Sequence, residues 1–207
     1  MKMGGLTGGI YKISLWIMRL SLANLLWILF TILGAVIFGI FPATTALFTI
    51  IKKWIKKEYD FAIFKTFWVA YRDDFKKSNI VGFILLTIGV FLYFDFKILN
   101  LYENQLLKII QILLVGISIF YIVTVTYIFP VLVHYKASAL LSIKNAFLVG
   151  MLAPLTTLSI VLSTIIIAYL SLYLPGLFVF FTVSILSMIH MLFANRELRK
   201  IDVKLTK

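Results

Sequence analysis

The side chains that could carry chemistry in this chain are few and widely separated. Asp73 and Asp74 are adjacent carboxylates, and the two histidines are His134 and His190. Neighbouring residues on a helix point about 100° apart, and no third carboxylate follows at i+4. The pair therefore predicts a solvated charge pair beside Arg72 rather than a metal site. Two histidines without cysteine exclude three- and four-histidine metal centres and a cysteine nucleophile, so we predict no catalytic residue, cofactor or metal.

Hydroxyl side chains form two stripes at helical spacing within apolar stretches. The first consists of Ser184, Ser187 and His190, and the second of Thr156, Ser159 and Ser163. Such stripes are typical of helices that pack through small side chains and hydrogen bonds, and a path for a neutral solute is the alternative. No acidic or basic residue lies near the middle of an apolar stretch, which argues against proton- or ion-driven transport.

The elements that hold these side chains are mostly apolar. Of 207 residues, 62% are hydrophobic and 14% charged, whereas soluble domains have roughly 45–50% and about 25%. The mean hydropathy is +1.06. A helix needs about 20 apolar residues to cross a bilayer, and five stretches approach this length: 20–41, 79–94, 109–133, 155–174 and 176–194. The sequence predicts an all-α, multi-pass transmembrane bundle of about five spanning helices, in a single domain covering 1–207.

The cations lie in short segments between the apolar stretches. This position indicates contact with anionic lipid headgroups rather than nucleic acid, although the net charge is +12. With five crossings, 15 of the 20 Lys and Arg residues fall on the side of segments 52–78, 134–153 and 195–207. That side, with the C-terminus, is predicted to be cytoplasmic. If the stretch 20–51 instead enters and returns as a hairpin, the division is 18 to 2 and the N-terminus is cytoplasmic too.

The segment 52–78 has an aromatic face at helical spacing. Its members are Phe61, Phe64, Trp68, Tyr71 and Phe75, and basic residues decorate the remaining surface. We predict an amphipathic cytoplasmic helix that follows the first spanning helix. Such a helix lies on the bilayer or packs under the bundle, and docking on a partner protein is the alternative.

Pro42 interrupts the first apolar stretch. Proline has no backbone N–H and therefore predicts a break or kink after Phe41. The hydroxyls of Thr44 and Thr45 are expected to bond backbone groups freed at this break, and Asn24 is expected to make interhelical hydrogen bonds. This break has two interpretations. It is either a kink at the cytoplasmic boundary or part of a broken helix that lines a substrate site.

Four motifs in the first half of the chain carry a family resemblance. They are NLLWILFT from Asn24, GIFPATTALF from Gly39, FKTFW from Phe64, and FKKSN ending at Asn79. Together they resemble the YesL-like family of bacterial integral membrane proteins, a domain of unknown function. Members of that family are often encoded beside sugar ABC transporters and enzymes that degrade plant polysaccharides.

The resemblance implies a non-enzymatic accessory or regulatory partner of a carbohydrate uptake system, such as a sugar ABC transporter, in the bacterial plasma membrane. The alternative is a small transporter or pore for a neutral solute, which rests on the Pro42 break and the hydroxyl stripes. The candidate structural or partner-binding residues are Asn24, Pro42, Thr44, Thr45, Phe64, Trp68, Tyr71, Phe75 and Asn79.

Overall fold

The computed structural model describes residues 5–99 and 105–205, and every regular element within these ranges is helical. The elements are α1 (Gly5–Leu33), α2 (Ile40–Ile55), α3 (Ile63–Asp73), α4 (Phe75–Leu99), α5 (Gln105–His134), α6 (Ala139–Leu152), α7 (Pro154–Tyr173), α8 (Pro175–Leu177), the π-helix η1 (Phe178–Thr182) and α9 (Val183–Leu205).

Five helical stretches in the described residues are long and apolar enough to cross a membrane: Gly8–Leu33, Phe75–Leu99, Leu107–His134, Pro154–Tyr173 and Pro175–Val203. Only 11% to 28% of the residues in their most apolar windows are buried inside the protein. The remaining apolar surface requires a non-aqueous medium. This finding confirms the predicted all-α, multi-pass membrane architecture with about five spanning helices.

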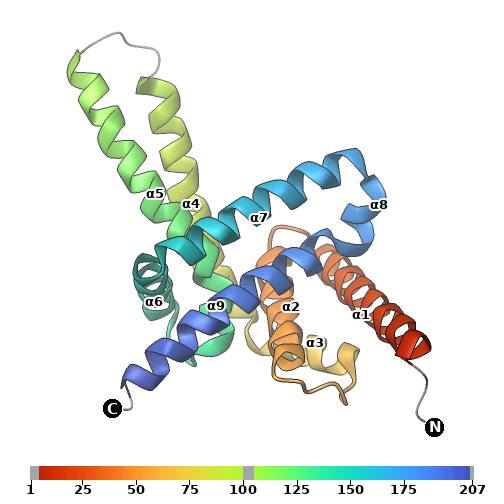
Figure 1. Cartoon of the computed structure of the whole chain (residues 1–207). Helices are drawn as coiled ribbons and strands as arrows, with labels where there is room; N and C mark the ends of the chain where they lie inside the picture. Colours follow the sequence, from red (N-terminus) through yellow and green to blue (C-terminus); the bar gives the residue numbers. More distant parts are fainter. Residues whose placement is uncertain (1–4, 100–104, 206–207) are drawn as a thin grey trace.

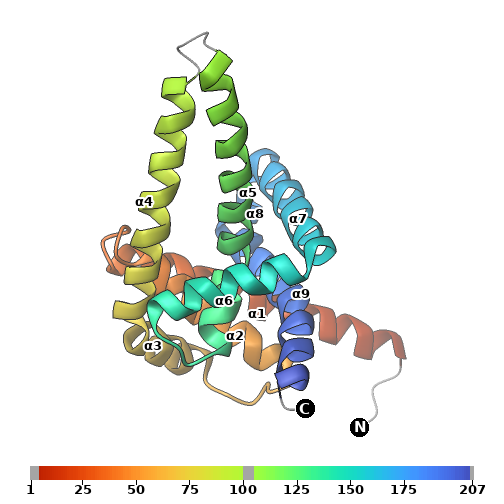
Figure 2. The same ribbon diagram turned by 90° about the vertical axis from the view of Figure 1, so that its left-hand side faces the viewer.

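Figures 1 and 2 show how the helices are arranged. α4 and α5 form a hairpin that projects at the upper end of both views. At the lower end lie α3, the connection between α2 and α3, and the ends of α5 and α9. We call this lower end the basic end, because the connection carries Lys56 and Lys57 and the last turns of α9 carry Arg199 and Lys200.

The first apolar stretch differs from the predicted single helix 20–41. α1 ends at Leu33, a turn follows at 34–39, and α2 returns antiparallel to α1. The Trp16 and Trp54 rings lie 5.7 Å apart, and the Trp27 indole donates to the Thr44 hydroxyl at 2.9 Å. The structure thus has the hairpin that the sequence left as the alternative. More than half of α2 is buried, and its 16 residues span about 24 Å.

Two further predictions were wrong in detail. Pro42 does not mark the break: it lies in the first turn of α2, and the chain breaks earlier at 34–39. The segment 134–153, predicted as a connection, contains the apolar helix α6, which packs along α5. The interhelical turns are short, so α6 could not be separated from its neighbours by hydropathy alone.

The core has two parts that meet along α9. One joins α1, α2, α3 and α9, and its buried members include Phe30, Trp54 and Met191. The other joins α4, α5, α6, α7 and α9, and includes Tyr127 and Leu198. α9 contributes buried residues to both, so it ties the two halves of the bundle together.

Candidate functional site

Pro42 leaves a backbone carbonyl without its helical donor, and Asn79 supplies a replacement. A residue at position 42 would normally donate its N–H to the carbonyl of Phe38, four residues earlier, but proline cannot. The Asn79 side-chain amide donates to that Phe38 carbonyl at 3.0 Å, and also to the Phe75 carbonyl at 3.0 Å. Because Asn79 lies on α4, this bond fastens α4 to the turn between α1 and α2. The Asn79 side-chain oxygen is buried without a partner.

The turn at 34–39 is tight and strained. Ala35 and Val36 have φ values of 54° and 64°, in the left-handed region that costs a non-glycine residue roughly 1–3 kcal/mol. A Cβ on Gly39 would overlap the backbone oxygen of Thr31, and a Cβ on Gly34 would overlap the backbone of Gly39. Both glycines are therefore required for the close approach of the two helix ends.

The threonines after Pro42 have a different role from the one predicted. Thr44 donates to the Ile40 carbonyl at 2.6 Å and Thr45 donates to the Phe41 carbonyl at 3.1 Å, so both bond within α2 rather than to the freed Phe38 carbonyl. Thr45 also lies 2.8 Å from the Ser78 hydroxyl on α4. Thr44 and Thr45 thus join α2 to α1 and to α4, as small polar side chains do between membrane helices.

Pro130 repeats the arrangement inside α5. α5 continues through Pro130, which leaves the Thr126 carbonyl without its helical donor. The ring of His190, on α9, hydrogen-bonds the backbone of Thr126 and lies 2.8 Å from the Thr164 hydroxyl on α7. His190 is thus a polar partner for the carbonyl that Pro130 leaves without a donor. Its contacts join α5, α7 and α9.

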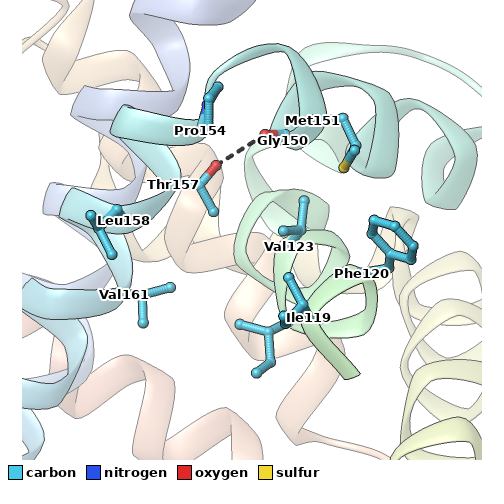
Figure 3. A pocket seen from close by; sticks show the side chains of 10 residues that line it. Ile119, Phe120, Val123, Gly150, Met151, Pro154, Thr157, Leu158 and Val161 are labelled. Carbon is cyan, nitrogen blue, oxygen red and sulfur yellow. Dashed lines mark hydrogen bonds between the residues drawn. The ribbon is translucent and has the colours of Figure 1, made fainter. Parts of the chain in front are cut away.

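Pro154 begins α7 directly after the end of α6, and the Gly150 carbonyl in the last turn of α6 is also paired by a side chain. It accepts the Ala153 N–H at 3.4 Å, and the Thr157 hydroxyl donates to it at 3.1 Å (Figure 3). The same hydroxyl is 3.0 Å from the Ala153 carbonyl and 3.2 Å from the Tyr127 hydroxyl. Here the donor belongs to the same local turn as the proline. The open groove of about 470 Å³ beside Thr157 is lined almost wholly by apolar side chains.

Asn24 pairs with another irregular backbone segment, the π-helix η1. Its side-chain amide donates to the carbonyls of Phe178 and Val179 at 3.1 and 2.7 Å. Its side-chain oxygen accepts from the backbone N–H of Ser184 at 3.0 Å, and the side chain is fully buried. The expected interhelical hydrogen bonds of Asn24 are thus present, and they join α1 to the start of α9. π-helical turns leave backbone groups poorly paired, which Asn24 compensates.

The hydroxyl stripes on α7 and α9 serve helix packing in the structure. Thr156 of α7 donates to Glu197 of α9 at 3.2 Å, and His190 of α9 lies 2.8 Å from the Thr164 hydroxyl of α7. Other members bond their own helix, as Ser159 does with the Leu155 carbonyl at 2.9 Å. These hydrogen bonds support the packing interpretation over a solute path.

Only the middle of the predicted aromatic face lies on α3, because Phe61 precedes this helix; on α3 the face divides into an inner and an outer part. The rings of Phe67 and Tyr71 pack on Phe30 of α1 with centroids 5.1 and 5.0 Å apart, and both side chains are buried. Phe64 and Trp68 contact the same Phe30 ring but remain 59% and 45% exposed. Phe67 was not predicted as part of this face, because it lies one position from Trp68 and so falls outside the spacing of three and four residues. Phe75 begins α4, beyond the end of α3, with its ring centroid 5.5 Å from that of Tyr71.

The carboxylates Asp73 and Asp74 stand at the end of α3. Asp73 accepts from Arg72 at 3.1 Å, as expected for a surface charge pair. Asp74 is half-buried, and its burial raises the pKa of its carboxyl, although nearby Lys77 acts in the opposite direction. Within the described residues no group of three His, Cys, Asp or Glu side chains is placed to hold a metal ion.

A polar cluster at the basic end was not predicted from the sequence. His134 on α5 lies 2.8 Å from Asp202 on α9, and Tyr135 donates to the same carboxylate at 2.9 Å. Burial, followed by this hydrogen bond, raises the pKa of Tyr135 to about 12. Lys52 of α2 donates to the Val133 carbonyl at 2.6 Å, and burial, followed by the charge of Lys56, lowers its pKa. The cluster joins the ends of three helices, and the 68-residue separation of His134 and Asp202 hides it from local sequence patterns.

Comparisons with known proteins agree on one family. A family model described as "Protein of unknown function, DUF624" matches residues 20–96, the region that contains Asn24, Pro42, α3 and Asn79. The uncharacterized protein YteU of Bacillus subtilis (strain 168) is 36% identical over 203 residues, which cover 98% of this chain and 90% of YteU. The uncharacterized protein YesL of the same organism is 30% identical over 199 residues, 96% of this chain and 94% of YesL. No solved structure matches the chain.

Proposed function

The chain belongs to the YesL-like family of unknown function, DUF624, and on this premise we propose that it is a non-enzymatic accessory protein that binds another membrane protein. The observation that carries the proposal is the outer part of the aromatic face, where Phe64 and Trp68 stay exposed. Large aromatic side chains, tryptophan above all, provide much of the binding energy at protein interfaces.

The construction of α3 supports a docking role. Its 11 residues span about 16 Å, too short to cross a bilayer, and it lies at the basic end (Figures 1 and 2). Phe67 and Tyr71 fix the helix on α1, so Phe64 and Trp68 are presented on a rigid support. A partner would therefore meet a preorganised surface and lose little conformational entropy on binding.

The proposed partner is based on the family resemblance, and the proposed orientation is based on the distribution of charges. We propose a carbohydrate uptake system, such as a sugar ABC transporter, as the partner, because the YesL-like family resemblance implies that context. The antiparallel hairpin of α1 and α2 supports the topology in which 18 of the 20 Lys and Arg residues share one side. On this basis we propose that the basic end, with both termini, faces the cytoplasm of a bacterial cell.

The experiment is affinity purification of the full-length protein from its own membranes in a mild detergent. We expect a stoichiometric transporter component to co-purify, and Trp68→Ala with Phe64→Ala to reduce its recovery at least tenfold. Phe91→Ala is the matched control, because Phe91 is also an exposed aromatic residue but lies on the membrane-spanning helix α4. Circular dichroism of each variant separates lost binding from lost folding.

Recovery of the partner by the Trp68 and Phe64 variants at wild-type level would contradict the proposed surface. Repeated isolation of the protein alone, together with flux of a neutral sugar into liposomes that contain only this chain, would favour the transporter alternative instead.

A further inference from the structure

A long groove runs between α1 and the segment formed by α8, η1 and the start of α9. Its volume is about 630 Å³, and its walls include Trp16 and Leu20 on one side and Leu177, Phe181 and Ile185 on the other. The groove is thus bounded by two segments that lie far apart in the sequence, α1 and the residues from Leu177 to Ile185. These walls are apolar, which suits a hydrocarbon chain.

One end of the groove is cationic. Lys12 of α1 is the only charged side chain among the described residues that line it. Two turns further along α1, the Arg19 guanidinium lies over the rings of Trp16 and Tyr59, at 5.7 and 4.8 Å from their centroids. Lys12, Trp16 and Arg19 are spaced by four and three residues and therefore share one face of the helix.

Arg19 contacts the connection between α2 and α3 through Tyr59. Tyr59 belongs to the connection between α2 and α3, which carries the charged residues Lys56, Lys57, Glu58 and Asp60 and must lie in a polar environment. Arg19 thus ties α1 to this charged connection. A tryptophan beside basic residues is also typical of the membrane–water interface.

We propose that this groove binds one anionic phospholipid, with an acyl chain along Trp16, Leu20 and Phe181 and the phosphate at Lys12. The charge favours an anionic headgroup over a zwitterionic one, because choline or ethanolamine would place a second cation near Lys12. A lipid held here would bridge α1 to η1 beside the Asn24 hydrogen bonds. The inference is independent of the proposed partner binding, since Phe64 and Trp68 do not line the groove.

The test is native mass spectrometry of the full-length protein with phosphatidylglycerol and phosphatidylcholine of identical acyl chains. We expect one phosphatidylglycerol to be retained in preference to phosphatidylcholine. Lys12→Gln should weaken phosphatidylglycerol binding about fivefold, the effect of one cation near an anionic surface, and leave phosphatidylcholine binding unchanged. Lys108→Gln, near the start of α5 and away from the groove, is the matched control and should change neither.

A second variant tests the apolar part without removing the charge. Ile185→Trp should fill the groove and reduce the binding of both lipids, while glycerol phosphate without acyl chains should fail to displace phosphatidylglycerol. Equal retention of the two lipids by the wild-type protein would overturn the proposal. So would wild-type phosphatidylglycerol binding by Lys12→Gln, or displacement of the lipid by glycerol phosphate.

Discussion

In two regions of the molecule a side chain donates to a backbone carbonyl beside a proline, at Pro42 and at Pro154, and the donor comes from a different place in each. Pro42 removes the donor for the Phe38 carbonyl, four residues earlier. The Gly150 carbonyl instead lies in the last turn of α6, just before Pro154, and already accepts the Ala153 N–H at 3.4 Å. Thr157 donates to Gly150 from within the same local turn, seven residues along the chain. Asn79 donates to Phe38 from a different helix, 41 residues away.

The two hydrogen bonds differ in how much of the protein must be folded before they can form. The Thr157 bond to Gly150 can form as soon as the α6–α7 turn forms, although the same hydroxyl also contacts Tyr127 of α5. The Asn79 bond requires α4 to be docked on the α1–α2 turn, which is itself strained at Ala35 and Val36. Loss of Asn79 should therefore loosen the packing of α4 on the hairpin, whereas loss of Thr157 should have a local effect.

The largest difference between the two regions is expected for the glycines. A Cβ on Gly39 meets the backbone oxygens of Thr31 and Phe30, whereas one on Gly150 meets side-chain atoms of Val123 and Tyr127. Backbone cannot yield as side chains can, so Gly39→Ala should lower the free energy of unfolding by about 3 kcal/mol and Gly150→Ala by about 1–2 kcal/mol. Unfolding in mixed micelles with increasing denaturing detergent measures the free energy lost by each variant. Equal losses for Gly39→Ala and Gly150→Ala would contradict the expected difference between backbone and side-chain contacts.

Asn79→Leu is expected to have the next largest effect. It leaves the Phe38 carbonyl without a donor but also removes the unpartnered oxygen of Asn79, so the net cost should be about 1–2 kcal/mol. Hydrogen exchange should rise in the turn 34–39 and at the start of α4. A rise confined to the α6–α7 turn would contradict the assignment.

Thr157→Val should cost less, about 0.6 kcal/mol, the average measured for hydrogen bonds between membrane helices by double-mutant cycles. Its hydroxyl bonds within one turn and with Tyr127, so exchange should rise near Gly150 and leave the turn 34–39 unchanged. The same unfolding titration measures the cost, and a value above that of Asn79→Leu would reverse the proposed order.

Val36→Gly should have the smallest effect and the opposite sign. Glycine adopts the left-handed φ of 64° without strain, although it increases the entropy of the unfolded chain. We expect the variant to be about 0.5–1 kcal/mol more stable. A destabilised Val36→Gly would show that the turn is not strained at this position.

The sequence predicts the helical membrane class well because span length and hydropathy are local properties. The break after Leu33 was not predicted, because alanine and valine rarely adopt the left-handed conformation that Ala35 and Val36 have here. The position of a proline in the sequence shows which carbonyl loses its donor. The replacement donor can come from any helix that packs nearby, and the sequence does not show which one. Thr44 and Thr45 were therefore predicted for the role that Asn79 has. The outer aromatic residues Phe64 and Trp68 were found by periodicity, whereas their role in partner binding stays a prediction.

A double-mutant cycle with Pro42→Ala and Asn79→Leu tests the central claim, that a side chain from α4 replaces the donor that Pro42 lacks. Alanine at position 42 restores an N–H that can bond the Phe38 carbonyl. We therefore predict that Asn79→Leu costs at most half as much in the Pro42→Ala protein as in the wild type. An identical cost in both backgrounds would show that Asn79 acts independently of the proline, and would contradict the account.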